Sequence, residues 1–153
     1  MKPQKILVPI DGSIPSKNAA KYAASLASQN GAKVILLHVY GPISQLLSGK
    51  GLQLVKEELS GHAEKLLQEY KVLLEDCGAS VTTISRAGGT GNVILNVADE
   101  IGCDLIVMGS RGHSAIEGAI MGSVAIKVLH GAKCPVLVTR QLREYYPDQA
   151  CFV

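Results

Sequence analysis

Short apolar runs alternate with longer segments of helical periodicity, and this alternation constrains the fold more than any other feature of the sequence. Four of the five apolar runs are almost uninterrupted, as expected of parallel strands covered by helices on both faces. The third run is more polar and is expected at an edge of the sheet. The five predicted strands span residues 5–10, 33–40, 80–86, 104–109 and 135–139.

Four helices are predicted between the strands, because apolar residues recur there every three or four positions. The first is capped by Ser13, has Pro15 in its first turn and stops at Gly31. The others carry their apolar residues over 52–73, 94–101 and 124–129. This order predicts a single doubly wound α/β domain with right-handed crossovers. We expect a five-stranded parallel sheet of order 3-2-1-4-5 with helices on both faces.

Length, charge and hydropathy limit the classes of partner. The chain has 153 residues, the size of one domain, and we divide it into a domain over 1–140 and a C-terminal tail over 141–153. Its net charge of +2, without a run of lysines or arginines, argues against nucleic-acid binding. The N-terminal apolar run is too short for a signal peptide, and no apolar run approaches the ~20 residues of a membrane span. We therefore expect a cytoplasmic protein that binds neither nucleic acid nor membrane.

The four cysteines lie far apart in the sequence, at positions 77, 103, 134 and 151. No two of them have the C-x-x-C spacing that is typical of zinc sites and redox motifs. The spacing therefore indicates neither a zinc site nor a redox site.

A glycine-rich segment, GSRGHSAIEGAIMGS (109–123), joins the fourth strand to the fourth helix. It is longer than a simple turn requires, and it matches neither common phosphate-binding fingerprint. Gly109 and Gly112 allow backbone amides to approach an anion, while Gly122 and Ser123 open a helix whose first amides are free donors. Arg111 adds a cation that can fork onto phosphate oxygens. The segment is either a binding loop for a ligand with several phosphates or a surface loop whose glycines only form turns.

The predicted topology favours the binding loop. In open α/β sheets, ligands bind beyond the carboxyl ends of the strands, where the strand order reverses. Pro9 and Asp11 lie at the end of the first strand, Val39 ends the second, and Gly109 ends the fourth. With the order 3-2-1-4-5, these three loops converge on one crevice.

Several segments together resemble the universal stress protein family, in particular its ATP-binding branch. They are KILVPIDGS, LLHV, DLIVMGSRG, the spacing G-x-x-G-(nine residues)-G-S, and VLHGAKCPVLV. The resemblance covers about residues 5–139 and leaves out the tail. It implies a homodimer of five-stranded parallel α/β domains, each holding ATP in the crevice described above.

The resemblance also implies roles for individual residues. It places Pro9 and Asp11 beside the adenosine, with Asp11 bonded to the ribose, and the main chain of Val39 against the adenine. The remaining ligand contacts that it implies are Gly109 beside the ribose and Gly112, Gly122, Ser123 and Val124 around the phosphates. The segment GGTG (88–91) departs from the family pattern at the start of the third helix. An aspartate in Asp-Gly-Ser is also a common turn or capping residue, and both roles for Asp11 are compatible.

The expected function is that of an ATP-binding regulatory protein, in which nucleotide alters the dimer or its affinity for a protein partner that the sequence does not identify. Magnesium would be held chiefly by the phosphates and water. Two alternatives stay open: a slow ATPase or autophosphorylating enzyme, and a nucleotide-free interaction dimer. Fast phosphoryl transfer needs a lysine, a metal-binding carboxylate and a water-positioning group, and Arg111 and Ser123 are the only candidates we can name.

The last predicted strand, from Pro135 to Thr139, is expected to form the dimer. It lies at the edge of a sheet of order 3-2-1-4-5, and Val136, Leu137 and Val138 carry no charge that would deter pairing. Antiparallel pairing with a second copy across a two-fold axis would satisfy its backbone groups. The alternative is that the tail, which holds three of the chain's six aromatic residues, covers this edge within one chain.

Overall fold

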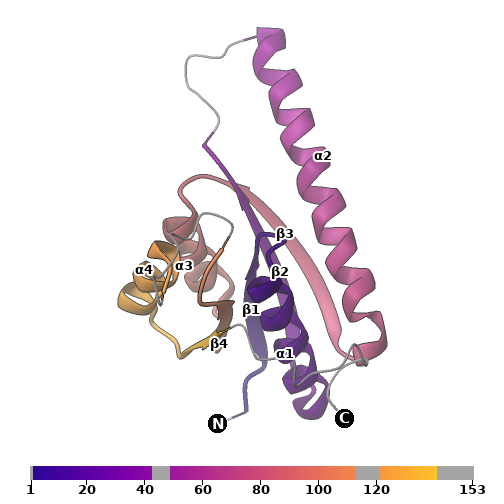
Figure 1. Cartoon of the computed structure of the whole chain (residues 1–153), viewed down its shortest axis with the longest axis vertical. Coiled ribbons are helices and arrows are strands. Elements are labelled where there is room, and N and C mark those ends of the chain that lie inside the picture. The colour runs from indigo at the N-terminus through magenta and orange to yellow at the C-terminus, as the bar shows by residue number, and fades with distance from the viewer. Residues whose placement is uncertain (1, 43–48, 113–120, 141–153) are drawn as a thin grey trace.

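A computed structural model describes residues 2–42, 49–112 and 121–140 of the protein. Within these residues, five strands and four α-helices alternate, with one turn of 3-10 helix (η1) after the second α-helix (Figure 1). In order they are β1 (Lys5–Ile10), α1 (Ile14–Asn30), β2 (Lys33–Tyr40), α2 (Gly49–Leu74), η1 (Glu75–Cys77), β3 (Ser80–Ala87), α3 (Thr90–Ile101), β4 (Leu105–Gly109), α4 (Ser123–Gly131) and β5 (Val136–Thr139). The predicted tail, 141–153, lies outside the described residues.

The strands form one parallel sheet in the order β3-β2-β1-β4-β5, so the predicted fold class is confirmed. The more polar strand β3 lies at one edge, as predicted, and β5 lies at the other. The pairing is extensive between β2 and β3, from Lys33↔Ser80 to Tyr40↔Ala87. Between β1 and β4 it is limited to Ile6↔Leu105 and Leu7↔Ile106. The backbone pairing is thus shortest between β1 and β4, where the strand order reverses.

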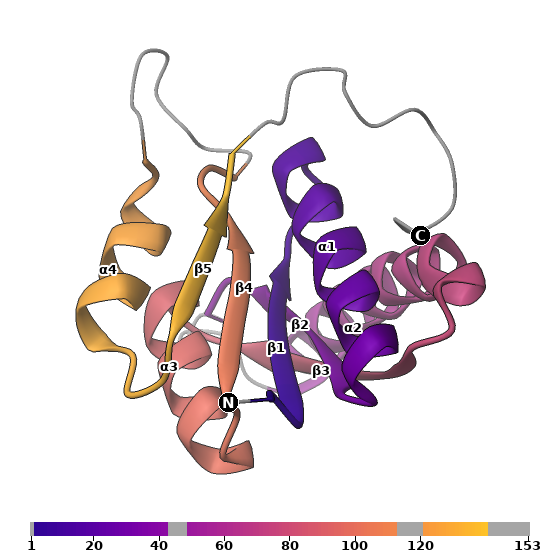
Figure 2. The same ribbon diagram turned by 90° about the horizontal axis from the view of Figure 1, so that it is seen from below.

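Helices cover both faces of the sheet (Figure 2). Helices α1 and α2 pack on one face, and α3 and α4 pack on the other. Small side chains bring α1 close to the sheet, since its inner face consists of fully buried alanines at 19, 20, 23, 24 and 27. Successive residues of a strand point to opposite faces. Accordingly, Ile6 and Val8 of β1 pack under α1, whereas Leu7 packs under α3 and α4.

The ends of α1 follow the predicted capping signals. Ser13 is the N-cap, and its side chain accepts a hydrogen bond from the Ser16 amide. Gly31 ends the helix in the left-handed conformation, with φ of 70°, and its amide donates to the Ala27 carbonyl. This conformation is costly for a residue with a Cβ, which explains the glycine. Capping therefore fixes where α1 begins, directly behind the end of β1.

Helix α2 is longer than the sheet that it covers, and its N-terminal half projects past the strands (Figure 1). Its buried residues are all in the C-terminal half: Ala63, Leu67, Tyr70 and Leu74. In the described part of the chain, no helix is both long and apolar enough to cross a bilayer.

Candidate functional site

The loops after β1, β2 and β4 converge at the carboxyl edge of the sheet, where they enclose a cavity of about 370 Å³. This volume is in the usual range for sites that bind small molecules. The sequence predicted nine ligand-binding residues, and all nine lie in the wall of this cavity: Pro9, Asp11, Val39, Gly109, Arg111, Gly112, Gly122, Ser123 and Val124. The predicted convergence is therefore present, while the contact of each residue with a ligand stays a prediction.

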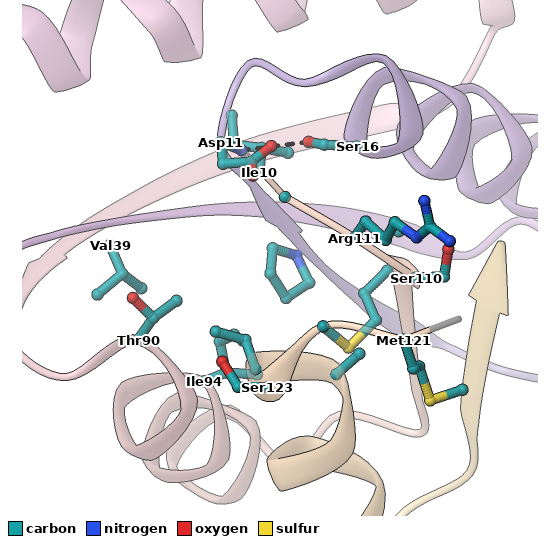
Figure 3. Close-up of a pocket in the computed structure, with 17 residues that line it drawn as sticks. Ile10, Asp11, Ser16, Val39, Thr90, Ile94, Ser110, Arg111, Met121 and Ser123 are labelled. Carbon is teal, nitrogen blue, oxygen red and sulfur yellow. Dashed lines mark hydrogen bonds between the residues drawn. The ribbon is translucent and has the colours of Figure 1, made fainter. Parts of the chain in front are cut away.

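Figure 3 shows how the labelled side chains are distributed around the cavity. Val39 and Thr90 lie together at one end, and Ser110, Arg111 and Met121 lie at the other. Asp11 and Ser16 form a third side, next to the start of α1. The walls combine apolar side chains with a few polar groups, which suits a ligand that has an aromatic base and a charged end.

Asp11 stabilises the turn after β1, as the Asp-Gly-Ser sequence suggested. Its Oδ1 accepts hydrogen bonds from the Ser13 amide at 3.0 Å and from the Ser13 hydroxyl at 2.6 Å. The Asp11 amide donates to the Ser16 hydroxyl at 3.2 Å. These bonds hold the carboxylate against the cavity wall. A fixed carboxylate at the end of a parallel strand is well placed to accept hydrogen bonds from sugar hydroxyls.

A buried tyrosine from α2 supports this loop from behind. The Tyr70 hydroxyl lies 2.8 Å from the Ser16 hydroxyl and accepts a hydrogen bond from the Gly12 amide at 3.2 Å. Tyr70 is fully buried, and burial raises the pKa of its phenol above the ordinary value of 10.0. The neutral phenol therefore joins α2 to the loop that carries Asp11.

Gly109 and Gly112 are required by close packing and not by an unusual backbone angle. A Cβ on Gly109 would lie 2.9 Å from the backbone carbonyl carbon of Pro15, at the start of α1. A Cβ on Gly112 would overlap the Asp11 carboxylate. The backbone after β4 thus passes directly beside the β1–α1 loop, and larger residues would fill the space between the two sides of the cavity.

The N-terminus of α4 faces the same cavity. Gly122 is the N-cap, in an extended conformation, and among the described residues no side chain caps this helix end. The Gly122 amide donates to the Ser110 carbonyl at 2.8 Å, and the Ser110 amide donates to the Thr139 carbonyl at 2.7 Å. The amides of Ser123 and Val124 then belong to the first turn, where donors have no partner within the helix and where the helix dipole favours an anion. Arg111 is exposed at the rim, so an anion held here would meet one cation as well.

The described residues offer no group of three or more histidine, cysteine, aspartate and glutamate side chains that could hold a metal ion. Among the described residues that line the cavity, Asp11 is the carboxylate and Arg111 is the cation.

Comparison with known proteins decides the family. Residues 2–140 match the universal stress protein family. This chain belongs to that family. Among curated relatives, the universal stress protein MJ0531 of Methanocaldococcus jannaschii is 34% identical over 140 residues, which are 90% of this chain and 82% of the relative. The universal stress protein YxiE of Bacillus subtilis is 36% identical over 145 residues, which are 89% of this chain and 98% of the relative.

Solved structures of other universal stress proteins share the fold. The structure of MJ0577 from Methanocaldococcus jannaschii superposes with a TM-score of 0.83 at 30% identity, covering 94% of this chain and 99% of that one. A universal stress protein in complex with cAMP superposes with a TM-score of 0.73 at 28% identity, over 91% and 98% of the two chains. The Archaeoglobus fulgidus universal stress protein in complex with dAMP gives a TM-score of 0.59 at 25% identity, over 90% and 98%. Relatives of this universal stress protein therefore bind adenine nucleotides.

Sequence reasoning missed a second set of residues that line the cavity. They are Ile10, Ser16, Thr90, Ile94, Met108, Ser110, Met121 and Ala125. The GGTG segment was the available signal for Thr90, since it marked an unusual start of α3 beside the crevice. Ile94 lies one turn further along the same helix. For the two methionines the sequence holds no such signal, because apolar residues next to a predicted strand or helix are ordinary core residues.

Proposed function

We propose that this universal stress protein binds ATP in the cavity at the carboxyl edge of the sheet and acts as a nucleotide-dependent regulatory protein. The observation that carries the proposal is that one cavity collects the ends of β1, β2 and β4 together with the uncapped N-terminus of α4. The cAMP and dAMP complexes of related proteins support an adenine nucleotide as the ligand class.

The adenine would occupy the end of the cavity that Val39 and Thr90 form. Strand β1 ends at Ile10, which pairs with His38, so within the described residues the backbone of Val39 lies beyond the last β1 partner of β2. That backbone is available to bond the polar edge of a base. Ile94 and Met108 supply apolar contact for the ring in the same cavity.

The ribose and phosphates would lie between Asp11 and the start of α4. Asp11 is held in place to accept ribose hydroxyls, and Gly112 lets the backbone pass beside it. Ser123 adds a hydroxyl to the amides of the first turn of α4. Arg111 contributes charge at the phosphate end, and magnesium would arrive with the phosphates.

The regulatory part of the proposal rests on dimerisation through β5. This strand is the edge of the sheet, and Val136, Leu137 and Val138 are only half-buried. Ile126 and Leu129 of α4, which packs on β5, are 46% and 40% exposed, so this helix also offers apolar side chains to a partner. Because α4 also forms the phosphate end of the cavity, a nucleotide there and a second copy at β5 would act on the same helix.

The direct test is to identify and titrate the ligand. Small molecules released from the purified protein are identified by mass spectrometry, and the emptied protein is titrated with ATP, AMP, cAMP and GTP by calorimetry. We expect ATP to be released or to bind at micromolar concentration, and GTP to bind at least tenfold more weakly. Absence of binding by all adenine nucleotides in a folded protein would refute the proposal, and a turnover assay on the same sample separates binding from hydrolysis.

A further inference from the structure

Two cysteines that are distant in sequence meet at the amino ends of β4 and β5. The cavity lies at the opposite, carboxyl ends of the strands. The sulfur atoms of Cys103 and Cys134 lie 3.6 Å apart, in van der Waals contact, although 31 positions separate the residues. Cys103 is buried, whereas Cys134 is partly exposed. The pair thus combines one partly exposed residue with one buried residue, and we expect Cys134 to be the one that reagents reach.

The backbones on both sides of the pair are fixed by hydrogen bonds. The Cys103 amide donates to the Ala98 carbonyl at 3.1 Å, which anchors it to the end of α3. The Ile106 amide donates to the Pro135 carbonyl at 3.0 Å, which ties β4 to the residue after Cys134. Figure 2 shows β4 and β5 side by side. The contact between the thiols therefore follows from the pairing of the two strands.

We propose that Cys103 and Cys134 form a reversible disulfide by exchange with a low-molecular-weight disulfide such as oxidised glutathione. A disulfide requires the sulfurs at about 2 Å, and from their contact distance of 3.6 Å we expect rotations about the two Cα–Cβ bonds to close the gap without a change in strand pairing. The proposal is independent of nucleotide binding, because neither residue lines the cavity.

The order of the two exchange steps follows from the surroundings of the thiols. Burial, followed by the neighbouring Cys134 thiol and the Asp104 carboxylate, raises the pKa of Cys103 to about 12. Since the thiolate is the attacking species, the accessible Cys134 reacts first. Its thiolate attacks one sulfur of the reagent, forms a mixed disulfide and releases one glutathione thiolate.

The second step closes the protein disulfide. The Cys103 thiol passes its proton to the glutathione thiolate released in the first step, its sulfur attacks the Cys134 sulfur, the mixed disulfide breaks, and the second glutathione leaves as a thiolate. In total, two protein thiols are oxidised, one glutathione disulfide is reduced to two thiols, and the two protein protons pass to the released thiolates. The new bond closes a covalent loop that contains β4, Gly122 and α4, and it ties the start of the edge strand β5 to the start of its neighbour β4.

Peptide mapping of the full-length chain tests the proposal. The folded protein is incubated with excess oxidised glutathione, remaining thiols are alkylated, and the protein is digested with trypsin without reduction. Each of the four cysteines falls on its own tryptic peptide, so the linkage is assigned directly. We expect peptide 87–111 joined to peptide 134–140, and complete separation of the two after reduction. The proposal is wrong if these peptides carry only alkyl groups or separate glutathione adducts, or if the link forms only after the protein has been unfolded in denaturant.

Variants assign the effect to the pair. Cys134→Ser should abolish the link and leave Cys103 as a thiol, whereas Cys151→Ser, which also removes one cysteine, should retain the link. In thermal unfolding, oxidation should raise the midpoint of the wild-type protein by about 5–10 °C, because the closed loop restricts the unfolded chain. No rise is expected for Cys134→Ser, and an equal rise in that variant would assign the stabilisation to other thiols and contradict the proposal.

Discussion

Replacement of Gly122 by valine should lower the affinity for ATP while changing the free energy of unfolding very little. In the structure, a Cβ at position 122 would lie 3.5 Å from the Ser110 carbonyl oxygen and 3.7 Å from the Arg111 Cα, which are ordinary contacts. The backbone angles, φ of −79° and ψ of 157°, suit a β-branched residue. Valine is a poorer N-cap than glycine but restricts the unfolded chain, so we expect the free energy of unfolding to change by less than about 1 kcal/mol.

The effect on ATP should be larger. A phosphate at the first turn of α4 has to approach the backbone closely, and the valine methyl groups would hold it away. The loss of one hydrogen bond between a charged group and an amide costs about 1.5–3 kcal/mol. That range corresponds to a decrease in ATP affinity of about ten- to a hundredfold, measured by calorimetry. The matched control is Gly61→Val in α2, where a Cβ meets nothing within 4 Å and where the affinity should not change. Unchanged ATP affinity in a folded Gly122→Val protein would refute the assignment of phosphates to this helix end.

Three further predictions concern the nucleoside contacts of Asp11 and Val39, the hydrogen bonds of Tyr70, and the dimer. Asp11→Ala should weaken ATP binding at least tenfold by calorimetry, while Val39→Ile should leave it nearly unchanged because only the backbone of that residue is used; equal effects of the two changes would argue against this orientation of the nucleotide. Tyr70→Phe removes one partner of the Ser16 hydroxyl and the acceptor of the Gly12 amide, and it should lower the free energy of unfolding in urea by about 1–3 kcal/mol. Because the pKa of Tyr70 is raised in the folded state, the contribution of its neutral phenol to the free energy of unfolding is complete below about pH 10 and is lost as the pH rises through the folded-state pKa. This alkaline loss of stability should be smaller in Tyr70→Phe. Identical dependence of the free energy of unfolding on pH in the two proteins would contradict this prediction. Leu137→Lys should convert a dimer to a monomer in light scattering, whereas a monomeric wild-type protein at micromolar concentration would exclude the dimer.

The elements of this fold were predictable because its local signals agree with one another. Ser13 and Gly31 mark the two ends of α1 in the sequence and in the structure. Strand boundaries differ from the prediction by one residue or less, as for β5, which begins at Val136 instead of Pro135. The order of the strands was predictable as well, since right-handed crossovers between parallel strands leave few alternatives.

Contacts between elements were less predictable than the elements. The cavity residues at strand ends were found because topology alone brings them together. Ser16 and Tyr70 were not, because periodicity shows which face of a helix is buried but not which polar atoms meet there. The contact of Cys103 with Cys134 depends on the register of β4 and β5, and the spacing of cysteines in the sequence carries no information about that register.

The short backbone pairing between β1 and β4 affects how stiff the sheet is along that boundary. The two strands share pairs only at Ile6 and Leu7, whereas β4 and β5 stay paired as far as Gly109↔Thr139. The strands therefore fall into two groups, β1, β2 and β3 in one and β4 and β5 in the other, and the backbone pairs between the groups lie only at their amino ends. A nucleotide bound between Asp11 and Ser123 would contact both groups of strands at their carboxyl ends. It would stiffen the sheet along the boundary between β1 and β4, where the backbone supplies the fewest pairs.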